Sequence, residues 1–88
     1  MDDKKIRGEL EALAVRLGMT IRYEPLKIDG SLHTGGYCRI RGHDVVIINK
    51  KASMRDKIHV LADALRRCDL KEIYILPSVR KILEGNGE

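Results

Sequence analysis

The sequence predicts an α+β domain, in which a three-stranded antiparallel sheet carries two longer helices and a short C-terminal helix. Two patterns predict this class. Apolar residues recur every three to four positions in an early and a late segment, and short runs between them alternate apolar with polar residues. A length of 88 residues is typical of one domain, so residues 1–88 are expected to fold as a single unit in the order helix, strand, strand, strand, helix, helix.

The first helix and strand follow each other near the N-terminus. The helix is predicted from an apolar stripe at helical spacing, made of Ile6, Leu10, Leu13 and Leu17. Gly18 supplies the helix end, and residues 19–24 then alternate until Pro25, which predicts the first strand. Residues 26–36 are rich in glycine and are expected to form a loop.

The middle of the chain is predicted to be a β-hairpin. Strand-like runs at residues 37–41 and 44–49 flank Gly42 and His43, which suit a two-residue turn. This turn sets a register with two defining pairs, Tyr37 with Ile48 and Arg41 with Asp44. Residues 45–48 are all apolar, as in a strand that lies centrally or is covered on both faces.

Two further helices are predicted in the C-terminal half. Ser53 is the expected N-cap of the longer one, whose apolar stripe consists of Met54, Ile58, Leu61, Leu65 and Cys68. Pro77 begins a short last helix that runs to Leu83, and residues 85–88 are expected to be a frayed tail.

Composition argues against several function classes. A net charge of +4, from 17 Lys and Arg against 13 Asp and Glu, permits an anionic partner but is mild for a nucleic-acid binder. Aromatic residues make up 3%, which is few for a surface that stacks bases. The N-terminus is charged and no apolar run approaches the roughly 20 residues of a membrane span, so a cytoplasmic location without membrane contact is expected.

One family resemblance rests on the order of several short stretches. They are Gly-Met-x-Ile at residues 18–21, Val-Ile-Ile-Asn at 46–49 and Val-Leu-Ala-x-x-Leu at 60–65. This order resembles the core of the ImmA/IrrE-like zinc metallopeptidases, whose His-Glu-x-x-His motif would fall on residues 63–67. Ala64 cannot act as a base there and Arg67 cannot bind a metal, so the resemblance implies neither activity nor zinc. Residues 35–42 also resemble a stretch shared by small uncharacterised bacterial proteins.

The leading candidate binding face lies on the predicted sheet. It combines basic, aromatic and apolar side chains: Arg22, Tyr37, Arg39, Arg41, Val46 and Ile48. If both long helices cover the opposite face, this one stays open as an apolar strip rimmed by arginines, which is typical of a protein interface. We therefore expect a non-enzymatic domain that binds a protein partner and forms a homodimer through this face. The competing possibility is that a helix crosses to this side, which would make Ile48 part of the monomer's own core.

Two other functions remain as alternatives. The first is a small nucleic-acid-binding module that uses Arg22, Arg39 and Arg41. The second is a metal-dependent hydrolase-like protein with a degenerate site, for which His59 and Asp63, four apart on one helix face, are weak candidates. No third ligand is placed near them, so no metal and no cofactor are expected. Cys38 and Cys68 are predicted to be buried free thiols that serve packing.

Overall fold

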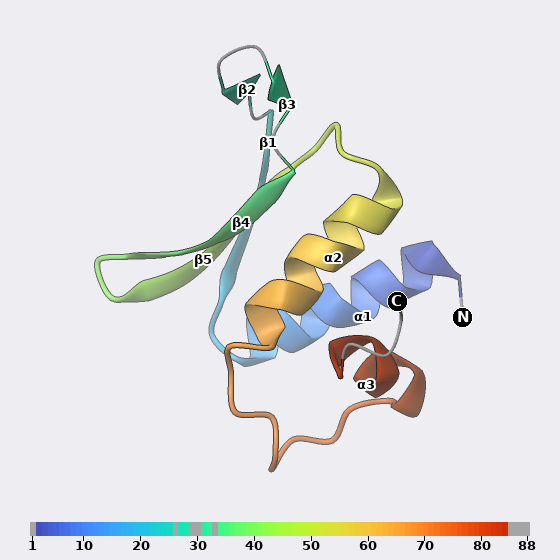
Figure 1. The fold of residues 1–88 in the computed structure, drawn as a ribbon. Helices are drawn as coiled ribbons and strands as arrows, with labels where there is room; N and C mark the ends of the chain where they lie inside the picture. The colour runs from blue at the N-terminus through green and yellow to red at the C-terminus, as the bar shows by residue number, and fades with distance from the viewer. Residues whose placement is uncertain (1, 26, 29–30, 33, 85–88) are drawn as a thin grey trace.

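The computed structural model describes the chain except for residues 1, 26, 29–30, 33 and 85–88 (Figure 1). The predicted frayed tail and part of the predicted loop therefore lie outside the described residues. In chain order the elements are α1 (Asp3–Arg16), β1 (Thr20–Glu24), β2 (Lys27–Ile28), β3 (Ser31–Leu32), β4 (Gly35–Ile40), β5 (His43–Asn49), α2 (Met54–Leu65) and α3 (Pro77–Leu83). The predicted α+β class is confirmed. Strands β2 and β3 form a two-residue antiparallel ladder where a loop was predicted.

The two longer helices begin at side-chain caps, of which Ser53 was predicted and Asp2 was not. The Asp2 side chain accepts a hydrogen bond from the Lys5 backbone N–H at 2.8 Å, and Ser53 accepts one from the Asp56 N–H at 3.1 Å. Each bond satisfies a backbone donor that the first turn of a helix leaves unpaired. Gly18 follows α1 with a φ of +87°, a conformation that glycine adopts without strain.

The three-stranded sheet is mixed rather than purely antiparallel, which corrects the prediction. Its order is β1-β5-β4, with β5 antiparallel to β4 and parallel to β1. The hairpin inserts its second strand between β4 and β1, so the four apolar residues of β5 occupy the centre of the sheet. Apolar alternation along β1 carries no information on the direction of its neighbour, and for that reason the sequence pattern did not reveal the parallel pair.

The hairpin turn is formed by Arg41 and Gly42, one position earlier than predicted. Their φ values are +51° and +81°, and His43 pairs with Ile40 at the end of the ladder. Hairpins of this type need positive φ at both central residues, which matches the right-handed twist of the strands. As a result Tyr37 pairs with Val46 rather than Ile48. The observed register differs from the predicted one by two positions. Because side chains alternate between the two faces, every side chain stays on its predicted face.

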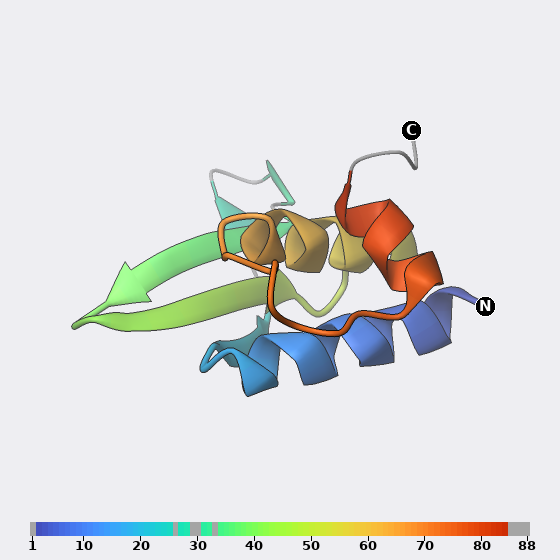
Figure 2. The same ribbon diagram turned by 90° about the horizontal axis from the view of Figure 1, so that it is seen from below.

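The helices cover the face of the sheet that was expected to stay open. Val46 and Ile48 are both 0% exposed and belong to one apolar cluster with Leu10 of α1 and with Leu61 and Leu65 of α2. Figure 1 shows the three helices on one side of the sheet, and Figure 2 shows the hairpin tip extending beyond them. Ile48 is therefore part of the monomer's own core, which was the competing possibility to an open face.

The opposite face of the sheet, here called the outer face, is covered by none of the described helices. Strand alternation places on it Cys38 and Ile40 of β4, Val45 and Ile47 of β5, and Arg22 of β1. Ile40 is 44% exposed, whereas Val45 is buried by its neighbours in the sheet. Among the described residues, this face is therefore apolar at its centre and exposes a single large apolar side chain.

Candidate interaction surface

The structure separates the residues of the predicted binding face. Val46 and Ile48 lie in the core, and Tyr37 is half-buried beside them. Arg22 lies on the outer face, where its guanidinium is 2.5 Å from the carboxylate of Glu24. Arg41 lies in the hairpin turn and is exposed. The six residues therefore form no common surface.

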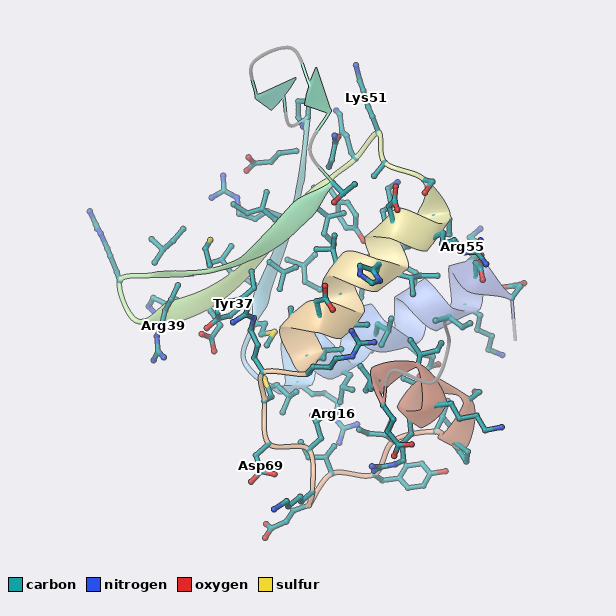
Figure 3. The ribbon with its side chains drawn as sticks, viewed as in Figure 1. Arg16, Tyr37, Arg39, Lys51, Arg55 and Asp69 are labelled. Atoms are coloured by element: carbon teal, nitrogen blue, oxygen red, sulfur yellow. The ribbon has the colours of Figure 1, made fainter. Side chains whose placement is uncertain are left out.

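Tyr37 and Arg39 do stay together, in a small polar cluster near the C-terminal end of α2. The Tyr37 hydroxyl donates to Asp44 at 2.6 Å, and Arg39 Nε lies 4.0 Å from the same carboxylate. The hydrogen bond to Asp44 is the main reason that the pKa of Tyr37 is raised above its ordinary value. Figure 3 shows Tyr37 between Arg39 and the end of α2.

Arg67 completes this cluster, and sequence reasoning missed that role. Its guanidinium carbon lies 5.0 Å from the centre of the Tyr37 ring, within the range of a cation–π contact. Among the described residues no hydrogen-bond acceptor for Arg67 is present. The spacing of 30 residues between Tyr37 and Arg67 gives no signal, because only the packing of α2 against β4 brings the two together.

His59 and Asp63 lie close together as predicted, but Asp63 also forms an ion pair with Arg66. His59 Nε2 lies 3.5 Å from Asp63, and the other carboxylate oxygen of Asp63 binds Arg66 at 2.5 Å. Arg66 in turn donates to the carbonyl oxygens of Ile82 and Leu83 at 2.8 and 2.9 Å. Asp63 therefore orients an arginine that caps the C-terminus of α3. Within the described ranges, no group of three His, Cys, Asp or Glu side chains is placed to hold a metal ion.

Both cysteines are free and half-buried, rather than fully buried as predicted. Cys68 packs against the core cluster, whereas Cys38 lies on the outer face. Burial, and after it the charge of Asp44, raises the pKa of the Cys68 thiol.

A groove with a volume of about 230 Å³ lies between α1 and the segment that leads into α3. From α1 it is lined by Glu9, Ala12, Leu13 and Arg16. The other wall consists of residues 74–76 and Val79. In Figure 3 Arg16 lies between α1 and the connection from α2 to α3.

The groove has an apolar floor and an amphipathic rim. Leu13, Ile75 and Val79 are buried at its base, whereas the Tyr74 ring at its edge is 73% exposed, more than any other large hydrophobic side chain described. A tyrosine beside an apolar hollow is a common anchor of protein interfaces, because its ring is large and rigid and its hydroxyl tolerates water. The groove surface, defined as Glu9, Ala12, Arg16 and Tyr74 around this floor, is the candidate interaction surface.

The sequence offered one weak signal for this surface. In residues 73–76 Tyr74 alternates with Ile73 and Ile75, so it faces away from two apolar neighbours. The segment was predicted to be extended, but its contact with α1 joins residues 58 or more positions apart and could not be predicted from local pattern.

Comparisons with protein-family models, with curated proteins and with solved structures found no match. In the part of the chain that the structure describes, no helix is both long and apolar enough to cross a membrane.

Proposed function

We propose that this chain is a non-enzymatic interaction domain that associates with itself through the groove surface. Tyr74 supports this proposal most strongly, because it is 73% exposed on the rim of an apolar groove. Leaving so large an apolar ring in water forgoes the burial free energy that a partner would supply. The surface consists of one face of a 14-residue helix and a short segment, so we expect an interface smaller than the roughly 800 Å² per partner of a standard one and therefore a weak dimer.

The outer face of the sheet is the competing docking surface, but it exposes fewer side chains that a partner could bind. Val45 at its centre is only 6% exposed, so among the described residues Ile40 is the one large apolar side chain exposed on this face. Arg22 on this face is already neutralised by Glu24. The groove surface instead combines a hollow, an exposed ring and two charged side chains that have no ion-pair partner among the described residues.

Sedimentation velocity of matched variants tests the proposal. Tyr74→Glu should convert a concentration-dependent dimer into a monomer, because the substitution places a charge at the anchor while costing an exposed position little stability. Val15→Glu is the matched control, since Val15 is 62% exposed on the same helix but does not line the groove. Ile40→Glu tests the outer face. Dissociation by Ile40→Glu with no effect of Tyr74→Glu would contradict the proposal.

Nucleic-acid binding is a second candidate, supported by the cluster around Tyr37. Arg39 and Arg67 are exposed beside Tyr37, and Arg41 is exposed in the nearby hairpin turn. Among the described residues, neither Arg41 nor Arg67 has a hydrogen-bond acceptor for its guanidinium group. Guanidinium groups of this kind suit phosphate oxygens. Fluorescence anisotropy with labelled single-stranded DNA tests it: Arg67→Gln should weaken binding, whereas Arg22→Gln, on the outer face, should not.

The side chains in the segment that aligns with the zinc motif do not favour the hydrolase-like alternative. At the positions that align with the zinc motif, Ala64 carries no ionisable group, Arg66 caps α3 and Arg67 stacks on Tyr37. Elemental analysis of protein purified without chelator tests this directly. One tightly held zinc per chain would restore the alternative.

A further inference from the structure

Two opposite charges are spaced along α1 so that they complement a second copy of the same helix. Glu9 and Arg16 both line the groove, and among the described residues neither side chain has an ion-pair or hydrogen-bond partner. They are seven residues apart, which is about 10 Å along a helix, too far to pair with each other. Ala12 lies between them on the same side and is exposed.

The symmetry of a dimer determines which orientation of two α1 helices pairs these opposite charges. In a two-fold dimer, if one residue contacts a second residue of the partner, the reciprocal contact also forms. Two antiparallel copies of α1 that place Glu9 opposite Arg16 of the second copy also place Arg16 opposite its Glu9. A parallel arrangement would instead put Glu9 against Glu9 and Arg16 against Arg16, which is repulsive.

We propose that the partner at the groove surface is a second copy of this chain, with the two α1 helices antiparallel and Glu9 of each copy paired with Arg16 of the other. This inference rests on the proposed function and adds its geometry. The helices then cross between Ala12 and Leu13, where the small Ala12 side chain allows close approach. Tyr74, on the edge of the same groove, packs beside the second copy's α1.

The choice of a second copy follows from charge complementarity. The rim carries one acidic and one basic side chain, so a partner needs the same two charges at the same spacing in the opposite order. This chain meets that demand by a two-fold rotation alone.

A charge-swap experiment tests the geometry in the full chain, with sedimentation equilibrium as the readout. Glu9→Arg and Arg16→Glu each place like charges opposite one another at two symmetry-related contacts, so each should raise the dissociation constant of the dimer about tenfold or more. The double variant restores both pairs with reversed polarity and should return to within about threefold of the wild type. Circular dichroism checks that each variant keeps its helices.

The outcomes separate this inference from the proposed function. Weakening by both single variants with rescue by the double variant supports the antiparallel pairing. If Tyr74→Glu dissociates the dimer but the single charge variants leave its affinity unchanged, or the double variant shows no rescue, the pairing is overturned while self-association through the groove stands. If the wild type stays monomeric and Tyr74→Glu changes nothing, both fail.

Discussion

The guanidinium of Arg66 donates a hydrogen bond to the backbone carbonyl of Leu83 at 2.9 Å, which joins the end of α2 to the last turn of α3. A second bond to the Ile82 carbonyl and an ion pair with Asp63 hold the same side chain. Arg66 therefore satisfies carbonyl groups that the end of a helix leaves unpaired, and it places a positive charge where the helix dipole favours one.

Replacing Arg66 should weaken the attachment of α3. Arg66→Ala is expected to lower the free energy of unfolding by about 2 kcal/mol, because charge-assisted bonds to two carbonyls are lost. His59→Ala, which removes only an exposed neighbour of Asp63, should cost less than about 0.5 kcal/mol. Urea denaturation of both variants provides the comparison, and equal losses would contradict the capping role.

Ile48 should behave as a core residue. Because it is 0% exposed under both long helices, Ile48→Ala is expected to cost about 2–5 kcal/mol and Ile48→Glu to abolish folding. Ile40, 44% exposed on the outer face, should tolerate Ala at a cost of about 1 kcal/mol or less. Unfolding curves of Ile48→Ala and Ile40→Ala provide the comparison. A folded Ile48→Glu variant would place the core elsewhere.

Gly35 should not tolerate substitution by alanine, whereas its neighbour Gly36 should. Its φ of +129° disfavours any side chain, and a Cβ added there would lie 2.1 Å from the Ile47 carbonyl oxygen of the paired strand. Gly35→Ala should therefore cost at least about 3 kcal/mol and separate the start of β4 from β5. Gly36 has nothing within 4 Å of an added Cβ, so Gly36→Ala is the control and should change stability by less than about 1 kcal/mol. Similar thermal unfolding of the two variants would refute this account.

Two tyrosines should make stability fall at alkaline pH. Burial is the first cause that raises the pKa of Tyr23, and its hydrogen bond to Glu11 adds to the effect, whereas the hydrogen bond to Asp44 raises that of Tyr37. The folded protein thus keeps protons that the unfolded chain, with tyrosine pKa values of about 10, releases. The free energy of unfolding should therefore decrease as pH rises above about 10.

The double variant Tyr23→Phe, Tyr37→Phe isolates this effect from other groups that titrate at alkaline pH. Its stability should change less than that of the wild type between about pH 9 and pH 11, because it lacks both phenols. Chemical denaturation at several pH values provides the measurement. Parallel pH profiles for the two proteins would show that the phenols keep their ordinary pKa values in the folded state.

The local elements were largely predictable, because they follow from short-range chemistry. Apolar spacing predicted the helices, Ser53 predicted the start of α2, and Pro77 predicted the start of α3. The side of the sheet that the helices cover was not predictable, because residues 45–48 are apolar on both faces. The turn was displaced by one residue because Arg41 accepts a positive φ that sequence rules assign to glycine.

The candidate site was less predictable than the fold. Arginine and tyrosine residues on the predicted strands indicated a binding face on the sheet, but Val46 and Ile48 are core residues. The groove depends on how α1 meets residues 74–79, a contact between distant parts of the chain. Periodicity treats Glu9 and Arg16 as ordinary solvated positions, and only the folded chain places them beside Tyr74.

Sedimentation equilibrium of the wild-type chain beside Tyr74→Glu, from about 10 μM to about 1 mM, tests self-association through the groove most directly. The wild-type mass should rise with concentration from 10.0 kDa toward twice that value, while Tyr74→Glu should stay at the monomer mass. A wild type that remains at 10.0 kDa throughout, or a Tyr74→Glu variant that dimerises as strongly as the wild type, would contradict it.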